Sequence, residues 1–136
     1  MPSFVIQQHD ATAMHYDLRL EVDGVLKSWA VPKGPSLDPA VKSLAVPVPD
    51  HALAYGGFEG GNVIIWDRGE YELTGGSVED GALSFVLHGE KLHGRFSLRR
   101  WKPEHWLLVK KADDEARRGS DITAERPESV RSGRTL

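Results

Sequence analysis

Short runs of alternating apolar and polar residues, separated by glycine-containing turns, are the feature that most restricts the fold of this chain. A period of two is typical of a half-buried β-strand, because successive side chains of a strand point to opposite faces. The first runs are SFVIQQH (3–9), MHYDLRLEV (14–22) and VLKSWAV (25–31). Asp23-Gly24, between the last two, suits a two-residue hairpin turn whose central residues both take positive φ. The pattern predicts an all-β fold, a small antiparallel barrel or sandwich.

Helix is scarce in the rest of the chain. Only DPAVK (38–42) predicts a single helical turn, with Asp38 as the N-cap and Pro39 at the first helical position. We therefore expect an antiparallel sheet with a few short helical turns. Its further strands are expected at 44–48, 62–67, 70–73, 83–88, 94–100 and 105–111.

The last 25 of the 136 residues differ in composition from the rest. They hold 11 charged residues, and their only sizeable apolar groups are Ile122, Val130 and Leu136. Such a segment buries too little apolar surface to offset the entropy lost on ordering. We expect one β domain over residues 1–111 and a mostly disordered tail or linker over 112–136.

The absence of cysteine excludes disulfides and thiolate metal sites, so any metal must be held by nitrogen and oxygen atoms. No apolar run is long enough to span a membrane, and the N-terminus has no secretory signal pattern. We therefore expect a cytoplasmic protein without membrane association. No long exposed apolar patch is evident, which favours a monomer.

Positive charge is concentrated in residues 91–111, which carry seven Lys and Arg residues against one acidic residue, in a chain of net charge −3. Trp101, His105 and Trp106 are interleaved with them. Basic and aromatic residues together can hold phosphates and stack on bases, so this block is a candidate nucleic-acid surface. The alternative is the ordinary solvated face of a strand.

One face of the strand 14–22 carries a candidate metal site. The strand period places His15, Asp17 and Arg19 on the same face, with neighbouring members about 6.6 Å apart. His9 ends the preceding strand, and a short turn can bring it beside them. Two imidazoles and one carboxylate leave open coordination positions and suit Mn²⁺, Fe²⁺ or Zn²⁺. The alternative is a polar face exposed to solvent.

Three other side chains could engage a phosphate. Lys33 could hold a phosphate oxygen, His51 could bond it or protonate a leaving group, and Tyr55 could donate a hydrogen bond. Each has an ordinary structural alternative, and spacing alone does not connect the three with His15.

At these residues the chain resembles the 3′-phosphoesterase domain of bacterial DNA ligase D and its free-standing relatives. The resemblance covers roughly residues 3–111, and GSDITAERPESV and SGRT in the tail resemble the segment that follows this domain in ligase D. The matching stretches are FVIQQHDATAMHYDLRLEVDGVLKSWAVPKGPSLDPAVK (4–42), DHALAY (50–55), FEG (58–60) and NVIIWDRGEYEL (62–73).

The resemblance implies a small β-barrel that binds Mn²⁺, with Zn²⁺ or another divalent cation as alternatives, and heals DNA 3′ ends during end joining. Its substrates would be primer-templates that end in a ribonucleotide or a 3′-phosphate, and its partners the ligase and polymerase modules of a repair system. By motif, His9, His15 and Asp17 match the metal ligands of the family. The residues that match phosphate-engaging groups are Arg19, Lys33, His51 and Tyr55.

The chain departs from the family pattern at several places. Ser43 stands where a basic residue is usual, and Pro49 where an acidic residue is usual. A glycine- and tyrosine-containing loop common in the family is missing after Gly60, and so is the arm before the first strand. These departures affect one phosphate contact and the recognition of the sugar or the DNA strand, whereas all three metal-ligand positions are kept.

Two other functions compete with hydrolysis. One is a non-catalytic module that holds DNA ends or repair partners, with a degraded active site. The other is an iron-dependent oxygenase with the same ligand set. Two imidazoles and a carboxylate beside an arginine favour catalysis over pure binding, and Arg19, Lys33 and His51 suit phosphate better than O₂ chemistry.

Overall fold

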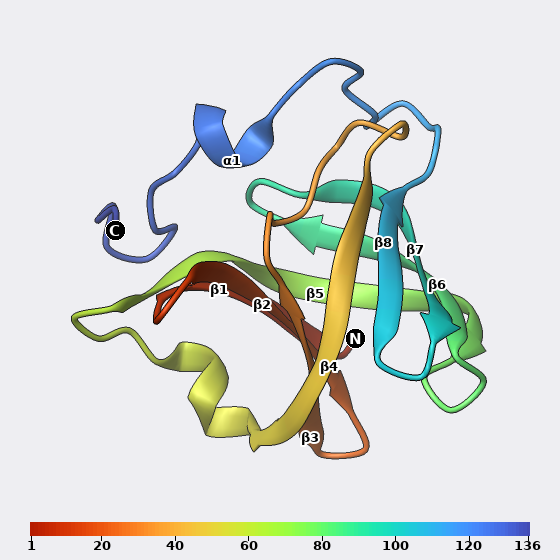
Figure 1. Cartoon of the computed structure of the whole chain (residues 1–136), viewed down its shortest axis with the longest axis horizontal. Coiled ribbons are helices and arrows are strands. Elements are labelled where there is room, and N and C mark those ends of the chain that lie inside the picture. Colours follow the sequence, from red (N-terminus) through yellow and green to blue (C-terminus); the bar gives the residue numbers. More distant parts are fainter.

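The computed structural model of the chain describes residues 1–136 and consists mainly of one antiparallel sheet (Figure 1). Successive strands pair in the order β1-β2-β3-β4-β8-β7-β6-β5, and β1 also pairs with β5, so that the sheet closes into a ring. The predicted all-β class with little helix is confirmed. The strands are β1 (Ser3–Asp10), β2 (Met14–Val22), β3 (Val25–Val31), β4 (Lys42–Ala52), β5 (Val63–Ser77), β6 (Ala82–Gly89), β7 (His93–Lys102) and β8 (His105–Lys110).

The predicted hairpin between β2 and β3 is confirmed. Asp23 and Gly24 have φ values of 50° and 83°, and the strands pair from Val22 and Val25 onward. Both turn residues therefore have the positive φ that this turn type requires.

The structure corrects two local predictions. The runs 62–67 and 70–73 belong to the single strand β5, which continues through Gly69. A Cβ at Gly69 would lie 2.0 Å from the His88 carbonyl oxygen, so the glycine permits close strand pairing and does not end the strand. Of residues 38–42, the first four form a turn instead of a helix, closed by the Val41 N–H donating to the Asp38 carbonyl, and Lys42 begins β4.

The even-numbered residues of β1 and β2 face the interior of the ring, where Phe4, Ile6, Leu18 and Leu20 belong to the main core cluster. The short 3₁₀ helix η1 (Leu53–Gly57), between β4 and β5, lies on the opposite, outer face. Polar residues of that outer face are therefore buried without entering the core. No helix of the chain is long and apolar enough to cross a membrane.

The charged C-terminal segment runs from the end of β8 to the left-hand ends of β1 and β5 in Figure 1. It contains the four-residue helix α1 (Ile122–Glu125), and Ile122 is buried. The Trp66 indole donates to the Arg126 carbonyl at 2.8 Å, and the Val130 N–H donates to the Ile65 carbonyl at 2.9 Å. These contacts differ from the expectation of a disordered tail. That expectation considered only apolar side chains, whereas most of the contacts use backbone groups. The domain boundary at residue 111 stays a prediction.

Candidate functional site

The three predicted metal ligands converge on the outer face of β1 and β2. His9 and His15 are directly paired across the two strands, and their ring centroids are 5.1 Å apart. Asp17 follows on the same face of β2, and ligand atoms of all three residues lie within 4.8 Å of one another. Strand period and hairpin pairing together therefore produce a cluster that could hold one metal ion.

Hydrogen bonding orients the His15 ring in this cluster. Its Nδ1 lies 3.2 Å from the Ala13 carbonyl oxygen. Its Nε2 lies on the side of the Asp17 carboxylate, 3.3 Å from Oδ1. Two nitrogens and an oxygen at this spacing fit the preferences of Mn²⁺, Zn²⁺ or Fe²⁺.

Asn62 is a further residue at this cluster that the sequence patterns do not single out. Its Nδ2 lies 3.3 Å from His9 Nε2 and 3.4 Å from the Asp10 carbonyl oxygen. The Asp10 N–H in turn donates to the Asn62 carbonyl at 2.9 Å. Asn62 therefore joins the loop before β5 to the His9 end of β1. The only signal in the sequence is its place at the start of the NVIIWD stretch.

Arg19 is buried beside the cluster, with 3% of its surface exposed. Its Nε donates to Gln7 Oε1 at 2.7 Å and its Nη1 to Ser28 Oγ at 2.8 Å. Its Nη2 lies 3.3 Å from Asp17 Oδ2. Burial lowers the pKa of Arg19, and the neighbouring Asp17 carboxylate acts in the opposite direction. Three fixed partners hold the plane of the guanidinium, an arrangement suited to bidentate contact with an anionic oxygen group.

His51 and Tyr55 lie over Arg19. Their rings stack with centroids 4.3 Å apart, and the Arg19 guanidinium carbon is 5.0 Å from the centre of the Tyr55 ring. Burial and the positive charge of Arg19 lower the pKa of His51, and Asp17 opposes this shift. A bulge in the β3–β4 pairing sets Leu26 opposite His51 and thereby the position of that ring.

Lys33 lies in the turn after β3, and no hydrogen bond or ion pair connects it with the cluster. It lines two open cavities of about 290 and 270 Å³ together with Ser43. The structure thus brings Arg19, His51 and Tyr55 together with the three candidate ligands and leaves Lys33 at depressions that none of these residues lines. Ser43, where the family usually has a basic residue, is buried and offers no charge there.

Gln7 and Ser28, the partners of Arg19, are also missed by sequence patterns. The Gln7 amide donates to the carbonyl oxygens of Tyr55 and Phe58, both at 3.0 Å, and so fastens the η1 segment onto β1. Ser28 is directly opposite Arg19 in the β2–β3 pairing, so the hairpin sets its position. The role of Gln7 depends on contacts with residues about 50 positions later in the sequence.

Only part of the basic block 91–111 is exposed to solvent. Lys91 and Lys110 are buried, and Lys110 is paired with Asp113 at 2.5 Å. At the β7–β8 hairpin, by contrast, Trp101 is 63% exposed and the Lys102 ammonium lies 4.7 Å from its ring centre. Exposed basic and aromatic residues therefore cluster near this hairpin, at Arg99, Arg100, Trp101 and Lys102, while Arg95 is exposed at the other end of β7.

Comparison with known proteins adds independent information. The family model described as the DNA Ligase D 3′-phosphoesterase domain matches residues 7–100. The chain is 52% identical over 151 residues to the multifunctional non-homologous end joining protein LigD of Pseudomonas aeruginosa, covering 98% of this chain and 18% of that protein. It is 40% identical over 137 residues to LigD of Mycolicibacterium smegmatis, covering 88% of this chain and 18% of that protein.

A third relative, the multifunctional non-homologous end joining DNA repair protein LigD of Mycobacterium tuberculosis, is 44% identical over 116 residues, covering 77% of this chain and 15% of that protein. The chain thus spans less than a fifth of the length of these relatives. The match to the Pseudomonas protein extends over 151 residues, more than the 136 of this chain, so the relative carries residues within the matched region that this chain lacks.

Proposed function

This chain belongs to the family of DNA ligase D 3′-phosphoesterase domains, and on that premise we propose that it is a Mn²⁺-dependent phosphoesterase that heals DNA 3′ ends in repair by end joining. The observation that supports this proposal most strongly is the convergence of His9, His15 and Asp17 beside the buried guanidinium of Arg19. A site of this kind combines ligands for a divalent cation with a fixed donor for phosphate oxygens.

We propose two hydrolytic steps at this site. In the first, water attacks the last phosphorus of a strand ending in a ribonucleotide, the bond to the terminal nucleoside breaks, and a 3′-phosphate remains. In the second, water attacks that phosphate, inorganic phosphate leaves, and a 3′-hydroxyl remains. The bound cation would supply the charge that polarises a phosphate oxygen and the attacking water.

The protein side chains have separate roles in this proposal. Arg19 donates to phosphate oxygens and neutralises the charge that builds on them in the transition state. Lys33, the flexible side chain in the turn after β3, holds another oxygen of the phosphate. His51 binds an oxygen or protonates the departing group, and the Tyr55 hydroxyl donates one more hydrogen bond.

The function is tested with 5′-labelled primer-templates, one ending in a single ribonucleotide and one in a 3′-phosphate. With Mn²⁺ we expect loss of one nucleoside from the first and of phosphate from the second, because both reactions use the same site. With a chelator both should stop. The measurement is the electrophoretic mobility of the labelled strand. If both strands stay intact in Mn²⁺, Zn²⁺ and Mg²⁺, the proposed enzymatic function is rejected.

A non-catalytic DNA-end or partner-binding module is the second candidate. The observation that favours it is the exposed Trp101 and Lys102 at the β7–β8 hairpin, where a base could stack beside a cation. Binding of both primer-templates without any shortened product would support this candidate. The ligase and polymerase modules of a repair system remain its proposed partners, and a cytoplasmic monomer remains the predicted state of the chain.

Replacement of His51 by alanine tests its place in the reaction. We expect turnover to fall by more than about tenfold, because general acid or hydrogen-bond catalysis by one residue contributes at least that much. Mn²⁺ affinity should persist, since His51 lies outside the ligand cluster. Single-turnover rates and Mn²⁺ titration measure the two effects separately, and unchanged turnover would remove His51 from the mechanism.

A further inference from the structure

The C-terminal segment ends in a compact turn, residues 129–134, which we call the C-terminal turn. Its centre is the buried side chain of Ser129, whose Oγ accepts the N–H groups of Arg131 and Ser132 at 3.0 Å each. The Gly133 N–H donates to the Ser129 carbonyl, also at 3.0 Å, and Gly133 has a φ of 75°. The turn therefore has a defined shape of its own.

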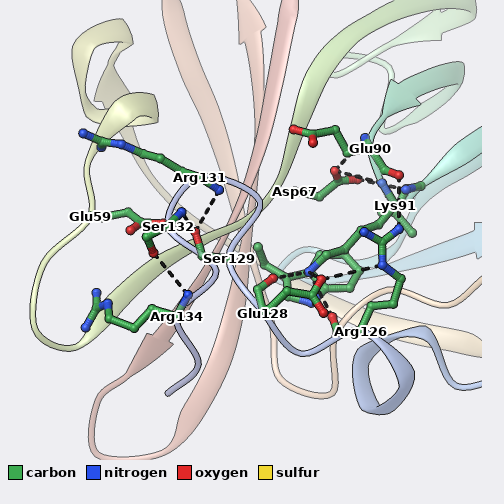
Figure 2. Close-up of polar contacts among 12 residues, drawn as sticks. Glu59, Asp67, Glu90, Lys91, Arg126, Glu128, Ser129, Arg131, Ser132 and Arg134 are labelled. Carbon is green, nitrogen blue, oxygen red and sulfur yellow. Dashed lines mark hydrogen bonds and ion pairs between the residues drawn. The ribbon is translucent and has the colours of Figure 1, made fainter.

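Contacts with Glu59, before β5, and with Lys91, between β6 and β7, hold this turn and the residues before it (Figure 2). Ser129 Oγ donates to Glu59 Oε1, and the same carboxylate oxygen accepts the Ile65 N–H at 2.8 Å. Before the turn, the buried Lys91 ammonium lies 4.4 Å from the Trp66 ring centre and donates to the Arg126 carbonyl at 2.9 Å. The contacts fix where the turn stands relative to β5.

From this position two arginines reach the segment from Gly57, the last residue of η1, to Val63, the first residue of β5, which we call the site loop. Arg131 Nη1 donates to the Gly57 carbonyl at 2.6 Å. Arg134 donates to three carbonyl oxygens of the same loop, those of Gly60, Gly61 and Val63. Two guanidinium groups thus donate to four backbone carbonyls of one short segment, two of which, those of Gly60 and Val63, also accept backbone N–H groups from each other's residues.

The site loop needs such support because of its composition. Gly57, Gly60 and Gly61 give it more conformational freedom in the unfolded chain than other residues would, so ordering it has a larger entropic cost. A side chain at Gly57 or Gly61 would touch nothing within 4 Å, so little packing restrains these positions. The arginine hydrogen bonds are charge-assisted and therefore stronger than those between neutral groups.

The other side of the site loop contacts the proposed active site. Asn62 lies against His9 Nε2, and the Phe58 carbonyl accepts the Gln7 amide, whose oxygen accepts Arg19 Nε. The loop therefore lies between the C-terminal turn and two groups of the site, a candidate metal ligand and the buried arginine.

We propose that Arg131 and Arg134 are positioning residues, which hold the site loop so that Asn62 orients the His9 ring and Gln7 orients the Arg19 guanidinium. The inference rests on the proposed function for its catalytic consequence, but the coupling of the turn to the His9 end of β1 is independent of it. The segment whose composition resembles a linker thus completes the site.

The test compares Arg134→Ala, Arg131→Ala and the double variant with the unsubstituted chain. Arg118→Ala is the matched control, because Arg118 is an exposed arginine of the same segment without a side-chain hydrogen bond. Without DNA, we expect Mn²⁺ affinity, measured by electron paramagnetic resonance of the free ion, to fall about tenfold in Arg134→Ala, the size typical of losing support behind a ligand. Hydrogen exchange of the Asp10 amide, which is bonded to Asn62, should accelerate.

With 3′-phosphate DNA, we expect kcat to fall about tenfold in Arg134→Ala while KM changes little, because misplacement of the site affects the reacting geometry more than strand binding. Arg134→Lys should recover only part of kcat, since an ammonium lacks the planar fork. Added guanidinium ion should restore part of the activity of the alanine variant. Arg118→Ala should match the unsubstituted chain in every measurement.

The inference is overturned if Arg134→Ala and the double variant keep the Mn²⁺ affinity and the Asp10 exchange rate of the unsubstituted chain. If the double variant fails to fold, Arg134→Gln gives the deciding measurement, and unchanged affinity and exchange in that variant overturn the inference equally. If the unsubstituted chain hydrolyses neither primer while Mn²⁺ affinity still falls in Arg134→Ala, the proposed function fails and the positioning role stands.

Discussion

Replacing Asp17 by asparagine is expected to lower Mn²⁺ affinity by about 100-fold or more and to reduce release of the 3′-phosphate at least as strongly, since even the loss of an outer-shell partner costs about 10–100-fold. Asp17 supplies the only carboxylate among the three converging side chains. An amide oxygen carries no net charge and attracts a divalent cation much less strongly. Mn²⁺ titration and single-turnover hydrolysis measure the two losses.

The same substitution also removes the negative charge beside Arg19, whose Nη2 lies 3.3 Å from Asp17 Oδ2. Leaving a buried charge without its partner costs about 3–5 kcal/mol, although the two other partners of Arg19 reduce this cost. We therefore expect a lower midpoint of thermal unfolding as well.

Asp10→Asn is the matched control for this experiment. Asp10 is an exposed carboxylate at the end of β1, next to His9 in the sequence but outside the ligand cluster. The Asp10→Asn substitution removes the same charge from the same end of the sheet. Because Asp10 is not one of the candidate ligands, the variant should keep the Mn²⁺ affinity and turnover of the unsubstituted chain. If Asp17→Asn binds Mn²⁺ as tightly as the unsubstituted chain does, the cluster is not the metal site.

The candidate ligands were predictable from sequence because only local rules determine their positions. The period of two places His15, Asp17 and Arg19 on one face of β2, and a short connection to β1 brings His9 opposite His15. Neither step depends on residues distant in the chain. The same rules predicted the Asp23-Gly24 hairpin.

The burial of that face could not be predicted in this way. An alternating polar face is ordinarily solvated, but here η1 covers it, because Gln7 binds two carbonyls of a segment about 50 positions later in the sequence. Asn62 reaches the site only through such long-range contacts, whereas Ser28 lies directly opposite Arg19 in the β2–β3 hairpin. The contacts of the C-terminal segment could not be predicted for a related reason. They use backbone carbonyls and the buried Lys91, and composition alone counts a lysine as a surface charge.

Substitution of Arg19 by lysine separates the geometry of this residue from its charge. The guanidinium binds Gln7 through Nε and Ser28 through Nη1, and a single ammonium cannot reproduce this fork. Burial, which already lowers the pKa of Arg19, also disfavours the charged form of a lysine in the same place. The variant therefore keeps a basic side chain at this position but loses the fixed hydrogen-bond donors of the guanidinium.

We expect the turnover of the 3′-phosphate substrate by Arg19→Lys to fall about 10²–10³-fold, the cost of removing one preorganised donor to transition-state charge. Mn²⁺ affinity should change far less, because Arg19 contributes no ligand atom. Arg68→Lys, at an exposed position on β5, is the control and should leave both quantities unchanged. Turnover near that of the unsubstituted chain would mean that phosphate charge is neutralised elsewhere, and Lys33 would then be the residue to replace. A loss of Mn²⁺ affinity as large as the loss of turnover would instead mean that Arg19 acts mainly by orienting Asp17, since the two effects would then have one cause.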